Sequence, residues 1–251
     1  IMLNKNLFND NEVALGSWIT LAHPAVAEIM ANAGFDWLAI DLEHSVITIR
    51  EAEELIRVIE LSNVVPLVRL TSNNSDLIKR VMDAGAHGII VPMVNSALDA
   101  EMAVQSIKYP PAGRRGVGLA RAQRYGADFE AYKKWQVNGS IVIVQIEHID
   151  AVNNFRDILS VPGVDGFIVG PYDLTSSMGI PGEFSNSKYL DVIERIGKIA
   201  NNMGVTGGVH IIEPDTKELA QRIDEGYKFI AYSLDIRMLD YSCRSALESI
   251  K

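Results

Sequence analysis

The chain has 251 residues, of which 48% are hydrophobic and 22% charged, and it carries a formal net charge of -9 at pH 7. A globular protein of this composition can bury a sizeable core, and the acidic balance argues against nucleic-acid binding, which needs a basic surface. Cys243 is the single cysteine, which excludes a disulfide within the chain and a zinc site built from several thiolates.

The sequence also argues against a membrane or secreted protein. No apolar stretch approaches the roughly 18 residues that span a membrane, and the first residues lack the apolar region of a signal peptide. One unpaired thiol fits a reducing compartment. We therefore expect a cytoplasmic enzyme or binding protein.

Strand-like apolar runs alternate with helical patterns along the whole chain. The predicted strands are, in order, Leu15–Ile19, Trp37–Glu43, Val65–Leu70, His87–Met93, Ser140–Glu147, Val164–Gly170, Val205–His210 and Phe229–Ser233. The predicted helices are Pro24–Ala33, Thr48–Leu61, Asn74–Ala84, Ser96–Ile107, Asp128–Asn138, His148–Leu159, Ser187–Met203, Pro214–Asp224 and Ile236–Ile250. The segment Tyr109–Gly126, rich in glycine and proline, is predicted as a long ordered loop. A second loop rich in glycine and proline is predicted from the end of the sixth strand to Gly182.

This alternation predicts a (β/α)8 TIM barrel. About eight βα units in about 250 residues is the usual size of that fold, and we predict a single domain over residues 1–251. The main alternative is a doubly wound sheet, which normally has a glycine-rich phosphate-binding turn after its first strand. The segment Ser17–Trp18–Ile19–Thr20 has no such pattern.

Polar side chains gather where four of the predicted strands end. They are Asp41, Glu43 and His44 after the second strand, Arg69 after the third, Gln145 and Glu147 after the fifth, and Tyr172 and Asp173 after the sixth. Barrel enzymes place their active sites at the C-terminal ends of the strands. We therefore expect these side chains to form one site.

Glu147 and Asp173 follow neighbouring strands, so their carboxylates can converge. Together with water they make a hard oxygen site suited to Mg²⁺ or Mn²⁺, with Co²⁺ as an alternative. Taken singly, each acid fits a helix cap better, and Asp173 before Leu174 would be such an N-cap. Two acids at adjacent strand ends, beside Gln145, favour a metal site.

His44 and Arg69 are the candidates for proton transfer and charge stabilisation. A histidine titrates near neutrality and can take and return a proton, although His44 could equally bond only the barrel rim. A cation at the position of Arg69 can hold a carboxylate or a developing enolate oxygen. A salt bridge from Arg69 to Glu43 or Asp41 is a serious alternative, and both roles can hold at once.

Four further residues have weaker signals. Trp18 ends the first strand and is predicted on the pocket wall, in contact with substrate, rather than in the core. His210 ends the seventh strand and could line the pocket. His23 precedes a helix that begins with proline and fits a cap, and His87 opens a strand at the end of the barrel where residues serve stability.

Several stretches together resemble the HpcH/HpaI family of class II pyruvate aldolases, which includes 4-hydroxy-2-oxoheptanedioate, 2-dehydro-3-deoxygalactarate and 2-keto-3-deoxy-L-rhamnonate aldolases. The matching stretches are Ala33–Gly34–Phe35–Asp36–Trp37, Ile40–Asp41–Leu42–Glu43–His44, Val68–Arg69, Val91–Pro92–Met93–Val94, Tyr109–Pro110–Pro111–Ala112–Gly113–Arg114–Arg115–Gly116, Val144–Gln145–Ile146–Glu147, Val164–Asp165–Gly166 and Gly170–Pro171–Tyr172–Asp173–Leu174. They cover nearly the whole chain, in order and at family spacing. As a set they are specific for the family and not for one substrate.

The resemblance implies a divalent metal on Glu147 and Asp173, with pyruvate chelating the metal and also contacting Gln145 and the backbone at Tyr172. It implies that His44 is the base, acting through water. The family pattern adds two roles: Asp83 would raise the basicity of that histidine, and Arg69 would steady the enolate. It also implies a C-terminal helix that packs on a partner subunit, in dimers that assemble into hexamers as a trimer of dimers.

The expected activity is cleavage of a 4-hydroxy-2-oxo acid into pyruvate and an aldehyde, or the reverse. Tyr172 stands where relatives often carry alanine, and the loop 116–126 also differs from related enzymes, so the resemblance does not transfer the identity of the aldehyde. Two other functions stay open: a lyase for an acyl-CoA like the citrate-lyase β subunits, and a catalytically silent barrel that binds oxo acids.

Overall fold

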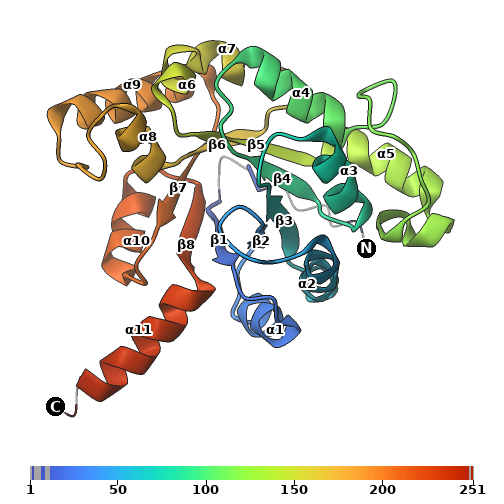
Figure 1. The fold of residues 1–251 in the computed structure, drawn as a ribbon, viewed down its shortest axis with the longest axis horizontal. Coiled ribbons are helices and arrows are strands. Elements are labelled where there is room, and N and C mark those ends of the chain that lie inside the picture. The colour runs from blue at the N-terminus through green and yellow to red at the C-terminus, as the bar shows by residue number, and fades with distance from the viewer. Residues whose placement is uncertain (1, 3–6, 9–11, 249, 251) are drawn as a thin grey trace.

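The computed structural model describes residues 2, 7–8, 12–248 and 250. Eight parallel strands close into a barrel in the order β1 to β8, and the helices lie around it (Figure 1). The strands are β1 (Ala14–Ile19), β2 (Trp37–Asp41), β3 (Val65–Arg69), β4 (Gly88–Val91), β5 (Ile141–Ile146), β6 (Gly166–Val169), β7 (Gly207–Ile211) and β8 (Phe229–Leu234). The predicted TIM barrel is confirmed.

The helices follow the strands in the expected alternation. They are α1 (Pro24–Asn32), α2 (Ile49–Leu61), α3 (Ser75–Asp83), α4 (Ala97–Ile107), the 3₁₀ helix η1 (Arg121–Gly126), α5 (Phe129–Gly139), α6 (Ile149–Asn153), α7 (Phe155–Leu159), α8 (Pro171–Ser177), α9 (Ser187–Met203), α10 (Thr216–Asp224) and α11 (Asp235–Glu248).

Local signals in the sequence explain where several helices begin. Thr48 and Glu51 form the expected capping box at the start of α2. The side chain of His23 caps α1, which has Pro24 in its first turn. Such caps satisfy backbone N–H groups that have no partner within the helix.

Two predicted segments differ from the structure. Residues 171–177, expected as part of a loop, form α8, because proline suits the first turn of a helix and Pro171 stands there. The predicted helix His148–Leu159 is instead two short helices that meet at Asn154. The segment Tyr109–Gly126 is an ordered loop, as expected, with η1 at its end.

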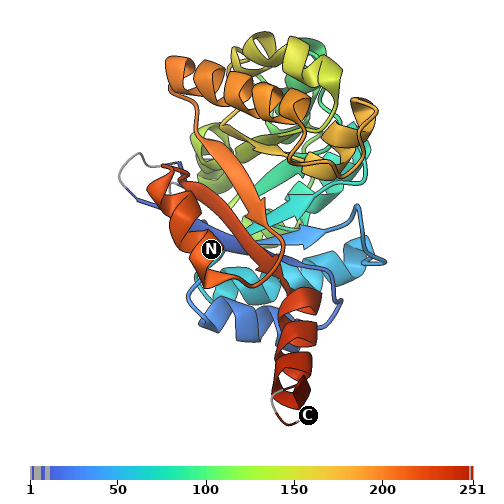
Figure 2. The ribbon, with the colours of Figure 1, turned by 90° about the vertical axis from the view of Figure 1, so that its left-hand side faces the viewer.

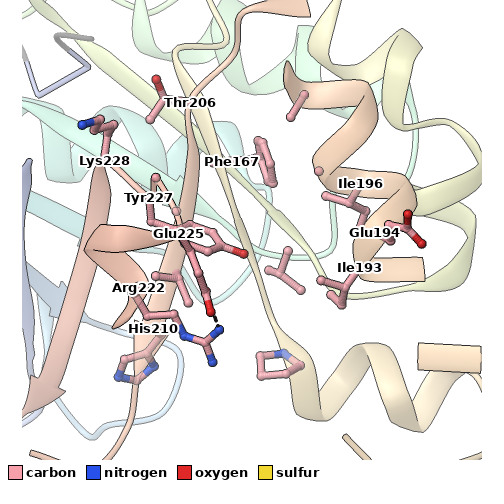
Figure 3. Close-up of a pocket in the computed structure, with 18 of the residues that line it drawn as sticks. Phe167, Ile193, Glu194, Ile196, Thr206, His210, Arg222, Glu225, Tyr227 and Lys228 are labelled. Atoms are coloured by element: carbon pink, nitrogen blue, oxygen red, sulfur yellow. Dashed lines mark hydrogen bonds and ion pairs between the residues drawn. The ribbon is translucent and has the colours of Figure 1, made fainter. Parts of the chain in front are cut away.

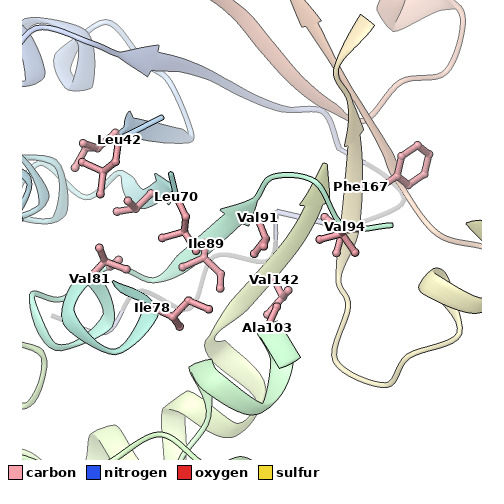
Figure 4. Close-up of a cluster of buried hydrophobic side chains, with 14 of the residues drawn as sticks. Leu42, Leu70, Ile78, Val81, Ile89, Val91, Val94, Ala103, Val142 and Phe167 are labelled. Carbon is pink, nitrogen blue, oxygen red and sulfur yellow. The ribbon is translucent and has the colours of Figure 1, made fainter. Parts of the chain in front are cut away.

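The core has an inner and an outer part. Inside the barrel, Trp37 stacks on Phe229 with ring centroids 4.3 Å apart. A Cβ atom at Gly16 would lie 2.0 Å from the Trp37 ring, so only glycine fits there. The outer part joins strands to helices, and Figure 4 shows a section of it with Val81 of α3 and Ile89 of β4. These buried apolar layers hold the strand ends in fixed relative positions.

The last helix, α11, does not pack along the barrel. It projects away from the other elements in two perpendicular views (Figures 1 and 2). Its exposed side chains include Leu239, Tyr241 and Leu247. Among the helices of the described residues, none is long and apolar enough to span a membrane.

Candidate active site

The barrel brings the predicted polar residues of β2 and β3 together at its C-terminal end. Asp41 and Arg69 are the last residues of these strands and pair in register. Arg69 donates from Nε to Oδ1 of Asp41 at 2.8 Å and from Nη2 to Oδ2 at 2.6 Å. Asp41 also accepts the backbone N–H groups of Glu43 at 3.0 Å and His44 at 3.2 Å. One buried carboxylate therefore fixes both the cation and the turn that carries His44.

Glu43 lies between Arg69 and His44. Its Oε2 atom is 3.5 Å from Nε of Arg69 and 3.9 Å from Nε2 of His44, and it accepts no hydrogen bond from the described residues. Burial raises the pKa of Glu43 to about 7; the charge of Arg69 opposes this rise, and the charges of Glu147, Asp41 and Asp173 add to it. Carboxylates at or just after the ends of β2 and β5 and in α8 therefore share one electrostatic environment.

Glu147 is buried at the end of β5, with 3% of its surface exposed. Its Oε1 atom accepts the backbone N–H of Met93 at 2.6 Å, and its Oε2 atom accepts a short hydrogen bond from Nε2 of Gln145. Burial raises the pKa of Glu147, and the charge of Asp173 adds to the rise. A Cβ atom at residue 170 would lie 2.8 Å from Oε2 of Glu147, so Gly170 is required beside this carboxylate.

Asp173 lies in the first turn of α8, which begins at Pro171 after the N-cap residue Gly170. The alternative that Asp173 is merely the N-cap of a helix starting at Leu174 is therefore wrong. Its side chain is exposed at the end of the barrel where Glu147 is buried. A carboxylate in the first turn of a helix also meets the positive end of the helix dipole.

The donor set at this place fits a hard divalent cation. Glu147 and Asp173 repel one another, and the buried Oε1 atom of Gln145 has no hydrogen-bond partner among the described residues. Oxygen donors of this kind suit Mg²⁺ or Mn²⁺. No cluster of three or more acidic, histidine or cysteine side chains able to hold a metal occurs in residues 12–248. A cation held by Glu147 and Asp173 would take its remaining ligands from water or substrate.

His44 is accessible and Trp18 is not. The His44 side chain is 65% exposed, which lets its ring meet a substrate or water. Trp18 packs in the inner core with 3% of its surface exposed, so the expectation that it lies outside the core is wrong, while its contact with substrate stays a prediction. The guanidinium carbon of Arg69 lies 4.5 Å from the Trp18 ring centroid. The Trp18 ring thus stabilises the Arg69 guanidinium by a cation–π contact.

Asp83 does not lie beside His44 within one chain. It ends α3, and the chain then returns to the start of β4, where His87 donates its backbone N–H to Pro66 at the start of β3. Asp83 is therefore at the opposite end of the barrel, near the charges of Arg115 and Lys79. The predicted pairing of Asp83 with His44 would need a second subunit and stays a prediction.

His210 lines the cavity between α9 and α10, which also includes Tyr172. Its Nε2 atom is 3.3 Å from the carbonyl oxygen of Ser233, and a carbonyl can only accept, so Nε2 carries the hydrogen. Burial lowers the pKa of His210 to about 4, and the charge of Arg69 adds to this effect. His210 is therefore neutral near pH 7.

Sequence reasoning found only part of the role of three residues that build this geometry. The salt bridge predicted from Arg69 to Glu43 or Asp41 is confirmed: Asp41 holds Arg69 at 2.6 Å, and Glu43 faces it at 3.5 Å. The sequence did not show which of the two acids would hold the cation. The signal for Gly170 was its place directly after a strand, where glycine permits a close approach. All three act through contacts between different strands.

The chain is similar to known proteins over nearly its whole length. The family model described as HpcH/HpaI aldolase/citrate lyase matches residues 14–240. A hydroxypyruvate/pyruvate aldolase of Roseobacter denitrificans is 35% identical, over 94% of this chain and 91% of that protein. A 2-dehydro-3,6-dideoxy-6-sulfogluconate aldolase of Pseudomonas putida is 36% identical, over 94% and 92%.

A crystal structure of an HpcH/HpaI aldolase/citrate lyase family protein from Burkholderia cenocepacia J2315 has the same fold. It superposes with a TM-score of 0.91 at 32% sequence identity, and the match covers 97% of this chain and 96% of that one. The chain described here belongs to the HpcH/HpaI aldolase/citrate lyase family.

Proposed function

We propose that the protein is a divalent-metal-dependent aldolase that cleaves a 4-hydroxy-2-oxo acid into pyruvate and an aldehyde, or joins them. The observation that carries this proposal is the convergence of Glu147, Asp173 and Gln145 with the fixed cation Arg69 at one end of the barrel. Curated relatives at 35% and 36% identity are named as aldolases. A metal-dependent aldol reaction needs a cation site, a proton acceptor and a stabiliser of the enolate.

Glu147 and Asp173 would hold the metal, with Mg²⁺ or Mn²⁺ as the first candidates and Co²⁺ as an alternative. When bound, such a cation supplies Lewis-acid polarisation of a carbonyl. Gln145 orients Glu147 through its amide N–H, and the backbone N–H of Met93 holds the other carboxylate oxygen. A Cβ atom at residue 170 would collide with the Glu147 side chain, so the glycine lets this carboxylate keep its position.

Arg69 would bind the oxygen on which negative charge grows as pyruvate becomes its enolate. A guanidinium keeps its proton at working pH, so Arg69 acts by charge and hydrogen bonds rather than as a base. Because Asp41 occupies Nε and one Nη atom, the second Nη group remains for the substrate. Trp18 and Asp41 keep the cation in place before substrate binds.

His44 would exchange the proton of the substrate hydroxyl, through water as the family resemblance suggests. Its exposure supports a water-mediated path. Glu43 lies 3.9 Å from Nε2 of His44. Among the described residues, Glu43 is therefore the acid that lies against the His44 ring. Tyr172 would offer its backbone to pyruvate.

Two other activities are less well supported. An acyl-CoA lyase like the citrate-lyase β subunits would need a basic groove for a nucleotide, and the strand-to-helix connections contain no lysine or arginine in the described chain. A silent oxo-acid-binding barrel would have no reason to keep Arg69 and His44 next to two converging carboxylates. We therefore rank both below the aldolase.

We further propose that α11 packs on a partner subunit, in dimers that form a hexamer as a trimer of dimers. The support is that α11 leaves the barrel and exposes Leu239, Tyr241 and Leu247, since apolar side chains of this size are usually covered. Sedimentation velocity would test the hexamer. The cytoplasmic location stays a prediction.

The deciding experiment is a coupled assay for pyruvate release from 4-hydroxy-2-oxopentanoate, run with Mn²⁺ and with EDTA. We expect release that EDTA abolishes and added Mn²⁺ restores. Release that is equally fast in EDTA would reject the metal-dependent aldolase. No release, together with retained binding of pyruvate, would favour the silent barrel.

A further inference from the structure

His210 carries a fixed, uncharged hydrogen-bond acceptor. Its Nε2 atom holds the hydrogen that the carbonyl oxygen of Ser233 accepts at 3.3 Å, so Nδ1 holds the lone pair. Nδ1 has no hydrogen-bond partner among the described residues, and the ring is only partly buried. The side chain can therefore accept one more hydrogen bond and has no further hydrogen to donate.

The backbone of Ser233 is held in the conformation that sets this tautomer. Its φ is 52°, in the left-handed region that residues other than glycine rarely adopt. It lies in the part of β8 where the register with β1 shifts, as in a β-bulge. The Ser233 hydroxyl donates to the carbonyl of Ile212 at 2.9 Å, and the Ser17 hydroxyl donates to the carbonyl of Ser233 at 3.2 Å. These contacts fix the carbonyl that His210 meets.

The Trp18 ring connects His210 to Arg69. The ring centroids of His210 and Trp18 are 5.6 Å apart, and the guanidinium carbon of Arg69 lies 4.5 Å from the Trp18 centroid. The charges of Arg69 and Asp41 both act on His210. These residues all belong to one chain, so the arrangement is complete without a partner subunit. His210 therefore lies one ring away from the cation that would stabilise the enolate.

A large cavity gives a ligand room beside His210. The cavity between α9 and α10 has a volume of about 1230 Å³, and Figure 3 shows His210 at one end of it. Pro171 and Tyr172, which directly precede the proposed metal ligand Asp173, also line this cavity. The residues beside Asp173 and the ring beside Trp18 therefore border the same space, which is large enough for part of a substrate.

His210 is better suited to bind a substrate than to take its proton. Burial lowers the pKa of His210 to about 4, and the charge of Arg69 adds to this effect. A general base works best when its pKa is near the working pH, so His210 is a weak base at pH 7. A divalent cation on Glu147 and Asp173 would act on the ring in the same sense as Arg69. His210 therefore stays neutral when such a cation is bound.

We infer that His210 is a specificity-determining residue, whose Nδ1 atom accepts a hydrogen bond from a hydroxyl group of the aldehyde. This inference rests on the proposed aldolase function. A hydroxyl group can donate to Nδ1, whereas a methyl group in its place leaves a partly buried acceptor unpaired. A site built to pair with a hydroxyl group rejects the analogue that lacks it. The protein therefore favours hydroxylated aldehydes over alkyl aldehydes of the same length.

The test is aldol addition of pyruvate, with Mn²⁺ present, to two pairs of aldehydes. Glycolaldehyde and propanal differ by a hydroxyl or a methyl group next to the same carbon, and 3-hydroxypropanal and butanal differ in the same way one carbon further from the carbonyl. For each pair, the hydroxyl preference is kcat/KM for the hydroxylated aldehyde divided by kcat/KM for the alkyl aldehyde. Comparing this preference between two proteins cancels the intrinsic reactivity of the aldehydes.

His210→Phe keeps a ring beside Trp18 and removes the acceptor atom. In at least one pair, its hydroxyl preference should be about tenfold or more below that of the unchanged protein. The same preference in both proteins, for both pairs, would overturn the inference. Since a ratio reports only on the active fraction, partial unfolding does not change it, and His210→Leu takes the place of His210→Phe if that variant does not fold.

His210→Gln is the matched control. A glutamine amide can donate to the carbonyl of Ser233 and still offers an oxygen as acceptor, so this variant should keep most of the hydroxyl preference. A loss as large as that in His210→Phe would overturn the inference, because packing of the imidazole ring, and not an acceptor atom, would then set the preference.

A measurement without aldehyde separates this inference from the proposed function. Exchange of the pyruvate methyl protons in D₂O, followed by NMR on the unchanged protein, needs the enolate but no aldehyde. If exchange is absent, the aldolase proposal fails. If exchange is present while His210→Phe keeps the full hydroxyl preference, only the inference about His210 fails.

Discussion

Arg69 is fixed by Asp41 through two parallel hydrogen bonds, of 2.8 Å and 2.6 Å, across the neighbouring strands β2 and β3. The planar guanidinium matches a carboxylate in this bidentate geometry, which lysine cannot reproduce. The same carboxylate holds the backbone of Glu43 and His44. A cation set in place before the reaction stabilises developing charge without the cost of moving during it.

The first prediction concerns the energy of this pair. Asp41→Asn removes the charge that balances Arg69 and should lower the free energy of unfolding by about 3 kcal/mol, as expected when a buried ion pair loses one partner. Urea denaturation followed by circular dichroism measures this change. Glu53→Gln is the matched control, because Glu53 pairs with Arg57 at 3.0 Å on the surface, and it should cost about 1 kcal/mol or less. Similar losses in both variants would contradict the structural role of Asp41.

A second prediction follows from the raised pKa of Glu43. Burial and the neighbouring carboxylates of Asp41, Glu147 and Asp173 raise the pKa of Glu43 to about 7, against the charge of Arg69. The folded protein therefore binds a proton more tightly than the unfolded chain. The stability from this group is full below about pH 4.5 and is lost as the pH rises through about 7.

Glu43→Gln should consequently be more stable than the unchanged protein at pH 8, and this advantage should vanish near pH 5. The comparison is made by urea denaturation in EDTA, so that no cation shifts the titration. Glu54→Gln serves as the control, since Glu54 is an exposed acid 3.8 Å from Arg50. A stability difference that does not change between pH 5 and pH 8 would show that Glu43 is ionised throughout.

A third prediction addresses the metal. Glu147→Gln and Asp173→Asn each remove one of the two proposed charged ligands. Losing a residue that only orients a ligand typically weakens metal binding by about 10- to 100-fold. Both variants should therefore weaken Mn²⁺ binding by about a hundredfold or more. Isothermal titration calorimetry measures binding without reference to activity. Glu213→Gln is the control, because Glu213 is an acid at the same end of the barrel that pairs with Arg237 instead. Tight Mn²⁺ binding in either ligand variant would refute the assignment.

The sequence was sufficient to predict the barrel and the strand ends that carry the site. Buried parallel strands are continuous apolar runs, so Ile141–Ile146 and Trp37–Asp41 stand out from the amphipathic helices around them. The polar residues that follow them must then meet at one end, because all eight strands point the same way. Gln145, Glu147, Arg69 and Asp173 were found in this manner.

Other features depend on three-dimensional relations that no local pattern contains. The apolar run that predicts β1 does not show whether Trp18, near its end, faces solvent or the interior. In the structure Trp18 packs in the interior of the barrel. The family resemblance associates Asp83 with His44, yet α3 carries Asp83 to the opposite end of the barrel. The helix α8 was missed because Gly170, Pro171 and Gly182 indicate a loop, while a proline also suits a helix start.

The last prediction separates the roles of His44 and Arg69. Exchange of pyruvate methyl protons in D₂O with Mn²⁺ present passes through the enolate, and aldol cleavage adds transfer of the hydroxyl proton. Arg69→Lys keeps the charge and loses the fork held by Asp41, so it should slow both exchange and cleavage by about 10²–10³-fold. His44→Gln should slow cleavage by about 10²–10⁴-fold.

The control for His44 is His148→Gln, because His148 lies at the same end of the barrel, caps α6 and pairs with Asp150 at 3.3 Å. It should leave both rates close to those of the unchanged protein. If Arg69→Lys exchanges protons normally but fails in cleavage, Arg69 serves the aldehyde end, and its role at the enolate is wrong. If His44→Gln cleaves at the normal rate, the proton acceptor is another group, and Glu43, 3.9 Å from the His44 ring nitrogen, is the first to replace by glutamine.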